Sequence, residues 1–182
     1  MTDPRSDADL IALANAGGEA GQRAYEALYH RHRDWVYSLA LRFTRHHETA
    51  LDVTQEVFIY FLRKFPGFVL TAKLTTFFYP AVKNLAIAHR EKAQRFAGND
   101  EALAILPDEA VAQNDARAEM AAMMEALSEG HREVVLLRFV DGLSMQEIAD
   151  ALSLPVGTVK SRLHNALTML KNDERAKKFF ES

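Results

Sequence analysis

Six polar residues near the end of the chain have types and spacing suited to DNA recognition. On a helix over residues 156–172 they share one face, with two cations at its edges, and apolar residues occupy the other face. Small polar groups suit base edges, and cations suit phosphates beside the major groove. A solvated face of an ordinary amphipathic helix is the alternative. We predict DNA contacts by Thr158, Lys160, Ser161, Arg162, His164 and Asn165.

A helix that precedes residues 156–172 must hold this candidate DNA-binding helix in place. Ser144 and Glu147 form an S-x-x-E pattern, which lets serine and glutamate cap each other's free amides at a helix start. This pattern predicts a helix from about residue 144 to residue 152. Pro155 disfavours helical geometry at Leu154 and suits the first turn of a new helix. The two segments together predict a helix-turn-helix.

A polar stripe runs along one face of a second helical segment, which is predicted over residues 48–64. Asp52, Gln55 and Glu56 lie at i, i+3 and i+4 spacing, opposite an apolar face. An acidic and amide stripe suits docking against a basic helical partner. A solvated surface is again the alternative.

Aromatic and basic residues are mixed over residues 65–92. Aromatic rings stack on unpaired bases, and cations hold the nucleic-acid backbone. Most aromatic residues at this density belong to a core. Phe68 stands beside Pro66 and Gly67 in a predicted loop, with less core to enter, so we select it as the base-stacking candidate.

Several enzyme chemistries lack support in the sequence. The chain has no cysteine, which excludes a disulfide framework, a thiolate metal site and a cysteine nucleophile. Two pairs of histidines are too close in sequence to converge on one ion from a helix: His30 and His32 are two residues apart, and His46 and His47 are adjacent. No phosphate-cradling glycine loop or G-x-S-x-G motif is present. We therefore expect no enzyme activity, no metal and no cofactor.

Glycine and proline are scarce, at 8 and 5 residues, and apolar residues recur at three- and four-residue spacing. Both features predict an all-α fold. Besides the segments above, helices are expected over residues 9–16, 19–43, 75–95, 115–127 and 130–140.

The segment of residues 96–114 lacks this periodicity, and it is too long to be an ordinary loop inside one compact domain. We predict an acidic linker here, between two small helical domains over residues 1–95 and 115–182. The net charge of −3 argues at first against nucleic-acid binding. However, residues 96–120 hold six acidic residues and one basic residue, whereas residues 1–95 carry a net charge of +3.

The chain shows no targeting or membrane signal. The uncharged stretch from Leu74 to Val82 is far below the roughly 18 residues of a membrane span. The N-terminus, MTDPRSDADL, is acidic and polar, unlike a signal peptide. These features predict a cytoplasmic protein without membrane insertion.

Sequence motifs in both halves resemble one family. HREVVLLRF, DGLSMQEIA and PVGTVKSRLHNA resemble region 4 of bacterial sigma factors of the extracytoplasmic-function group. EALYHRHRDWVYSLALRF and ALDVTQEVFIYFLRKF resemble regions 2.1 and 2.2, and residues 74–95 stand where regions 2.3 and 2.4 belong. The resemblance covers nearly the whole chain in the expected order.

This resemblance implies a sigma factor that binds core RNA polymerase, recognises the −10 and −35 elements of promoter DNA, and helps to melt the promoter. It also implies an anti-sigma factor as a partner. By resemblance, Asp52, Gln55 and Glu56 bind core polymerase, and the −10 element meets Lys83, Asn84, His89 and Arg90 in addition to Phe68.

The chain departs from the family pattern at four positions. Pro80 should start or kink its helix, and Ala88 stands where relatives often carry an acidic residue. Asn165 and Leu167 replace residues that are commonly basic, which predicts weak DNA binding by the isolated chain.

Two other functions fit parts of the pattern. A free-standing helix-turn-helix regulator would bind an operator without polymerase, and a sigma-like interaction protein would bind no promoter. TQEVF and the mixture of aromatic and basic residues favour the sigma-factor interpretation over both.

Overall fold

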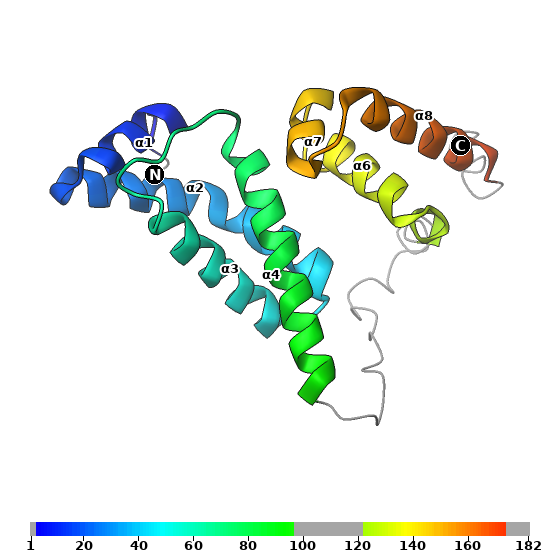
Figure 1. The fold of residues 1–182 in the computed structure, drawn as a ribbon, viewed down its shortest axis with the longest axis horizontal. Helices are drawn as coiled ribbons and strands as arrows, with labels where there is room; N and C mark the ends of the chain where they lie inside the picture. Colours follow the sequence, from blue (N-terminus) through cyan, green and yellow to red (C-terminus); the bar gives the residue numbers. More distant parts are fainter. Residues whose placement is uncertain (1–2, 97–121, 174–182) are drawn as a thin grey trace. The chain divides into compact units, whose positions relative to one another are not determined.

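The computed structural model describes residues 3–96 and 122–173, and their secondary structure is helical throughout, with no strand among them (Figure 1). These residues form two compact units, one before and one after residues 97–121. The all-α prediction is confirmed. The acidic linker predicted over residues 96–114 lies outside the described residues, except for residue 96 at the end of a helix.

The N-terminal unit contains four helices: α1 (Asp7–Ala16), α2 (Gly18–Thr44), α3 (His47–Leu62) and α4 (Leu74–Phe96). Helix α2 packs against each of the other three, and α3 also packs against α4. The helices begin and end within two residues of the predicted positions.

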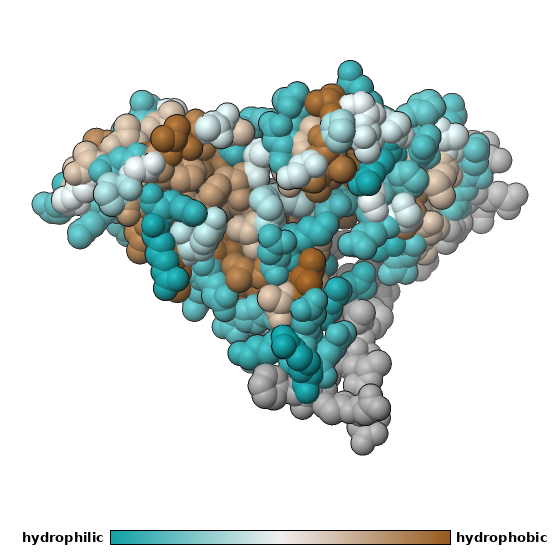
Figure 2. All heavy atoms as spheres, in the orientation of Figure 1, coloured by the Kyte–Doolittle hydropathy of each residue, from teal (hydrophilic) through white to brown (hydrophobic). Residues whose placement is uncertain are grey.

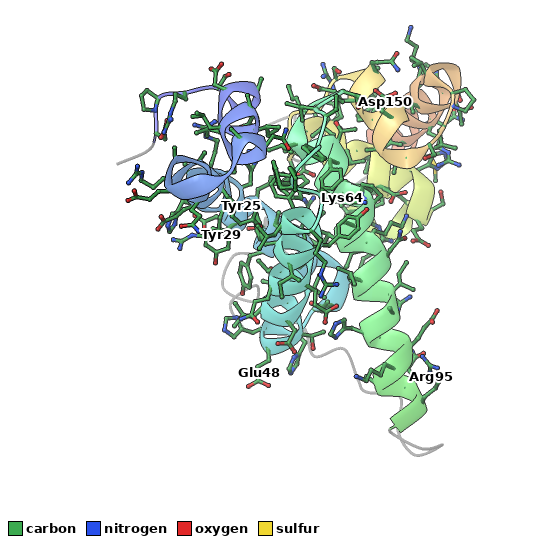
Figure 3. The ribbon with its side chains drawn as sticks, turned by 60° about the vertical axis from the view of Figure 1, so that its left-hand side comes forward. Tyr25, Tyr29, Glu48, Lys64, Arg95 and Asp150 are labelled. Carbon is green, nitrogen blue, oxygen red and sulfur yellow. The ribbon has the colours of Figure 1, made fainter. Side chains whose placement is uncertain are left out.

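Aromatic residues fill the centre of the N-terminal unit. Tyr25 and Tyr29 reach from α2 toward α3 (Figure 3), where their rings lie 5.7 Å from Phe61 and 4.7 Å from Phe58. Phe78 of α4 lies 5.1 Å from Phe61. Phe58, Phe61 and Phe78 are therefore core residues, as expected for most aromatics at this density.

Pro80 lies inside α4 and does not start it, so that part of the prediction was wrong. Its missing N–H leaves the carbonyl of Thr76 without the usual helical donor. The Thr76 hydroxyl oxygen is also buried and has no hydrogen-bond partner among the described residues. The helix passes through this position because Leu74, Phe78, Tyr79 and Val82 bury their side chains on either side of it.

The C-terminal unit contains helical residues 122–126, α6 (Glu129–Phe139), α7 (Met145–Leu152) and α8 (Val156–Asn172). Helix α8 packs against both α6 and α7. Ser144 and Glu147 form the predicted capping box, and Ser153 ends α7 in the left-handed conformation, with φ of 53°. The predicted helix-turn-helix is thus present over α7 and α8.

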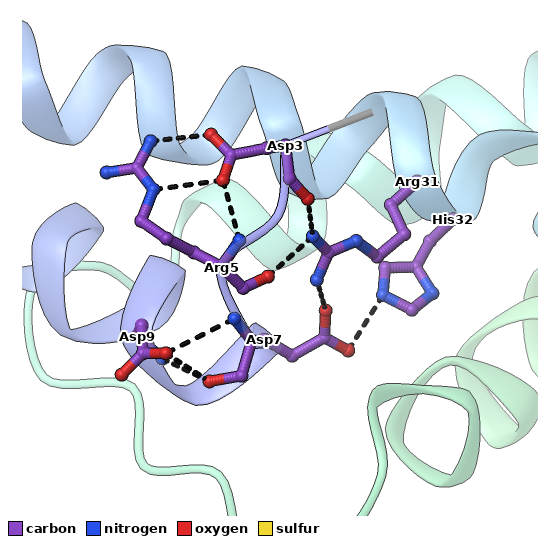
Figure 4. A network of polar contacts seen from close by, with 7 residues as sticks. Asp3, Arg5, Asp7, Asp9, Arg31 and His32 are labelled. Atoms are coloured by element: carbon purple, nitrogen blue, oxygen red, sulfur yellow. Dashed lines mark hydrogen bonds and ion pairs between the residues drawn. The ribbon is translucent and has the colours of Figure 1, made fainter. Parts of the chain in front are cut away.

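A charged network joins the start of α1 to α2 (Figure 4). The Asp7 carboxylate accepts a hydrogen bond from Arg31 at 2.6 Å and lies 2.9 Å from Nε2 of His32. Arg31 also donates to the backbone oxygens of Asp3 and Arg5. Burial lowers the pKa of His32, although the adjacent Asp7 carboxylate acts in the opposite direction. A neutral His32 can donate from Nε2 to Asp7 and complete the network.

We expect this histidine to make stability depend on pH. Unfolded His32 gains a proton below its ordinary pKa of about 6.5, whereas the folded form resists protonation, so the free energy of unfolding should fall as the pH drops below about 6.5. His32→Gln should remove this component in urea unfolding measured on both sides of that pH. The control His30→Gln, at an exposed position of the same helix, should keep it. An unchanged pH dependence in His32→Gln would contradict the assignment.

Candidate nucleic-acid interface

Helix α8 separates its apolar and polar faces. Val159, Leu163 and Ala166 are buried against the C-terminal unit. The candidate DNA contacts Lys160, Ser161, His164 and Asn165 are exposed, and Thr158 is half-buried. Leu167 lies on the apolar side of the helical wheel, but its side chain is 41% exposed and is not part of the core. Because α8 packs against α6 and α7 with its apolar residues, most of its polar face remains exposed.

Arg162 occupies a different environment from Lys160. It is half-buried, and a methyl group built onto Gly130 of α6 would lie 3.1 Å from its Nη1 and 3.3 Å from its Cζ. The guanidinium therefore packs over the backbone of α6, at a position where glycine leaves room for it. This placement gives Arg162 a structural role in the unit that the sequence did not predict.

On α3, the three candidate polymerase contacts form the predicted exposed stripe. Asp52, Gln55 and Glu56 are exposed, while the core-facing positions of the same helix are buried. Ile59 continues the stripe and is 49% exposed. The stripe thus combines acidic, amide and aliphatic groups on one helical face.

Glu56 also contacts a residue that the sequence assigned to a different surface. Its Oε1 lies 2.9 Å from Nε2 of His89, which projects from α4. Ion pairs near the surface contribute about 0–1 kcal/mol, and this contact is an ion pair only when His89 is protonated, so it orients the two side chains more than it stabilises the fold. The candidate polymerase and −10 residues therefore meet along the α3–α4 boundary.

The other candidate −10 residues of α4 differ in exposure. Asn84 and Arg90 are exposed, whereas Lys83 and His89 are half-buried. All four lie after Pro80, in the C-terminal part of the helix.

Phe68 is half-buried, contrary to the expectation that its loop leaves it little core to enter. Its ring lies 5.0 Å from that of Phe77 and 5.2 Å from that of Phe61, and it also contacts Phe65. The ring closes one end of the aromatic core. Only its outer part is available to a base.

Sequence reasoning missed Tyr60 and Val69, two accessible residues near Phe68. Tyr60 is 42% exposed and stacks on Phe77 with a 5.8 Å centroid distance and a 6° angle between the rings. The ammonium of Lys64 lies 4.6 Å from the centre of the Tyr60 ring, an arrangement that their i, i+4 spacing permits. Val69, the apolar residue after Phe68, is 74% exposed.

Hydrophobic residues also reach the surface of the N-terminal unit in the view of Figure 2. No described helix is both long and apolar enough to cross a bilayer. Within the same residues, no three histidine, aspartate or glutamate side chains gather in a way that would hold a metal ion.

Two family models match the chain. The model described as "Sigma-70 region 2" matches residues 28–96, and the model described as "Sigma-70, region 4" matches residues 117–170. Together they cover more than half of the sequence. The first spans α3, α4 and most of α2, and the second spans the helix-turn-helix.

Curated relatives agree with these matches over almost the full length. The ECF RNA polymerase sigma factor SigW of Bacillus subtilis is 28% identical over 169 residues, covering 85% of this chain and 90% of its own. The RNA polymerase sigma-H factor of Pseudomonas aeruginosa is 29% identical, with 91% and 92% covered. The chain belongs to the extracytoplasmic-function group of sigma-70 factors, which direct transcription initiation.

Solved structures share the fold. CnrH, in complex with the cytosolic domain of CnrY, superimposes with a TM-score of 0.65 at 24% identity, covering 91% of this chain and 94% of CnrH. The sigma factor RpoE of Bartonella quintana, in complex with the anti-sigma factor NepR, gives a TM-score of 0.60 at 20% identity, covering 84% and 99%.

The cap at Ser144 should contribute measurably to the helix-turn-helix. Its Oγ accepts from the Glu147 N–H at 3.2 Å, and its own N–H donates to the Glu147 carboxylate at 2.7 Å. Ser144→Ala should therefore cost about 1 kcal/mol of C-terminal stability, measured by hydrogen exchange of α7 and α8 amides. Ser128→Ala is the matched control, because the Ser128 hydroxyl contacts the His131 side chain and caps no backbone amide of α6. Equal losses in the two variants would argue against the cap.

Proposed function

We propose that the N-terminal unit docks onto core RNA polymerase through Asp52, Gln55 and Glu56 of α3. The observation that supports this role is the exposure of all three on one face of a helix whose other face is buried. An acidic and amide stripe complements a basic helical partner. The polymerase then carries out the chemistry, and this chain selects where transcription begins.

In this proposal the two units divide promoter recognition. Residues 1–95 bind the −10 element through Lys83, Asn84, His89 and Arg90, with Phe68 capturing an unpaired base. Residues 115–182 bind the −35 element through the polar face of α8, and the acidic residues 96–114 connect the two. The exposed Lys160, Ser161, His164 and Asn165 of α8 support the −35 assignment.

An anti-sigma factor and a cytoplasmic location complete the proposal. CnrH and RpoE, which share the fold, were each solved with a protein partner, and the partner of RpoE is an anti-sigma factor. A protein that acts on promoter DNA with polymerase works in the bacterial cytoplasm. We therefore propose that an anti-sigma factor restrains this chain there.

Charge reversal on α3 tests the docking surface. Asp52→Lys should weaken co-purification with core polymerase about tenfold, or about 1.4 kcal/mol, because it places a cation opposite a basic partner. Glu26→Lys makes the same charge change at an exposed position of α2 and serves as the control. Full retention of polymerase by Asp52→Lys would remove α3 from the interface.

Substitutions in α8 test the −35 surface. Lys160→Ala should lower promoter binding by the holoenzyme and reduce its salt dependence by about one phosphate contact. Lys171→Ala, in the last turn of the same helix, should have a smaller effect. Arg162→Ala should in addition speed hydrogen exchange in α6, because its guanidinium packs over Gly130. Unchanged promoter binding by Lys160→Ala would exclude this face from recognition.

A further inference from the structure

The side chain of Asn15, near the end of α1, forms hydrogen bonds with the backbone of the loop between α3 and α4. Its Oδ1 accepts hydrogen bonds from the N–H of Gly67 at 2.7 Å and of Phe68 at 3.0 Å. Its Nδ2 donates to the Phe68 carbonyl at 2.8 Å. One side-chain amide therefore binds three backbone polar groups of two adjacent residues, in a segment more than fifty residues away.

This contact lies at the tip of the loop. Backbone hydrogen bonds close the loop at its ends, from Lys64 and Phe65 to the end of α3 and from Thr76 and Phe77 to Lys73. At the tip, Gly67 has a φ of +107°, which side-chain-bearing residues rarely adopt, and no neighbouring atom fills the place of a Cβ. Backbone conformation, rather than lack of space, therefore requires glycine beside the Asn15 bonds.

The loop is held from two directions. Asn15 binds the backbone of Phe68, and the Phe68 ring packs against Phe61 and Phe77 of the aromatic core. Together these contacts fix both the position of the residue and the direction of its ring. The exposed Val69 follows directly.

Asn15 is itself presented by an anchored helix. Leu10, Ile11 and Ala14 of α1 are buried, and Asp7 at its start contacts Arg31 and His32 of α2. The sigma-70 region 2 match begins at residue 28, so α1 and Asn15 lie outside it.

We propose that Asn15 is a positioning residue for promoter opening, which holds the loop over residues 63–73 in the conformation that captures an unpaired −10 base. Asn15 acts through Phe68 and touches no DNA. A loop ordered in advance loses less conformational entropy when it binds the displaced strand. This inference rests on the proposed −10 role of Phe68.

The test compares Asn15→Leu, which removes all three bonds, with Asn15→Asp, which keeps the acceptor for Gly67 and Phe68. Gln22→Leu, at an exposed position of α2, controls for loss of an amide. The probe is a genomic fragment from which core polymerase and the wild-type chain make a specific transcript. Open complexes are measured by permanganate reactivity of thymines, and closed complexes by binding in the cold.

Asn15→Leu should form open complexes about tenfold less well on duplex DNA, as expected for losing hydrogen bonds that contribute jointly, while its binding to polymerase is unchanged. Asn15→Asp should lose less open-complex formation than Asn15→Leu, and Gln22→Leu should lose none. On a fragment with a pre-melted −10 region, Asn15→Leu should still bind less well than the wild-type chain, because capture of the unpaired base is weakened. Wild-type opening of duplex DNA by Asn15→Leu, or a loss of closed complexes equal to the loss of open complexes, would overturn the proposal.

Hydrogen exchange separates this inference from the proposed function. Asn15→Leu should speed exchange of the Gly67 and Phe68 amides whether or not the chain opens a promoter. Unchanged exchange would refute the clamp itself. Faster exchange, combined with a wild-type chain that opens no promoter, would refute the −10 role and with it the positioning of that role by Asn15.

Discussion

The N-terminal unit depends on the burial of one ring. Phe61 is fully buried and lies within 5.7 Å of the rings of Tyr25, Phe65, Phe68, Phe77 and Phe78, so that α2, α3, α4 and the intervening loop all meet at it. Truncating such a ring costs about 3–5 kcal/mol, because the space cannot collapse from every side. The same burial turns the opposite face of α3 outward, where Asp52, Gln55 and Glu56 are exposed. One packing constraint thus places both the candidate docking stripe and the candidate base-capturing loop.

In the C-terminal unit, helix caps and small apolar residues hold the helices together. Ser144 starts α7, Ser153 ends it in a left-handed turn, and α8 then buries Val159, Leu163 and Ala166. The polar face of α8 remains outside because the apolar face is used for packing. Arg162 shows the limit of this division, since its guanidinium packs over Gly130 while its neighbour Lys160 stays exposed. The two units therefore share a principle, in which one buried face determines which side chains a partner can reach.

Local signals were sufficient to predict the helices. Apolar periodicity and the Ser144 cap placed the described helix ends within two residues, and the start of the helix predicted over residues 115–127 lies outside the described residues. Long-range contacts had no such signal: the bonds of Asn15 to residues 67 and 68, the pairing of Glu56 with His89 and the packing of Arg162 each join separate elements. Of the two alternatives for Pro80, starting the helix is excluded, because the helix predicted over residues 75–95 continues through the proline and buries the neighbours of Pro80. The half-burial of Phe68 was missed because chain position alone does not show what a loop packs against.

In the proposed function, recognition of promoter sequence depends on polymerase, since the two candidate DNA-binding surfaces lie on separate compact units and the chain carries a net charge of −3. Binding of the chain to DNA in the absence of polymerase should therefore be weak and sensitive to salt. The most direct test is transcription of a genomic fragment library by purified core polymerase, with and without the chain. We expect transcripts from a defined set of start sites, sharing −35 and −10 sequences, that appear only when both proteins are present. A chain that yields no new start sites, or that binds specific DNA tightly and in high salt without polymerase, would contradict the proposed function.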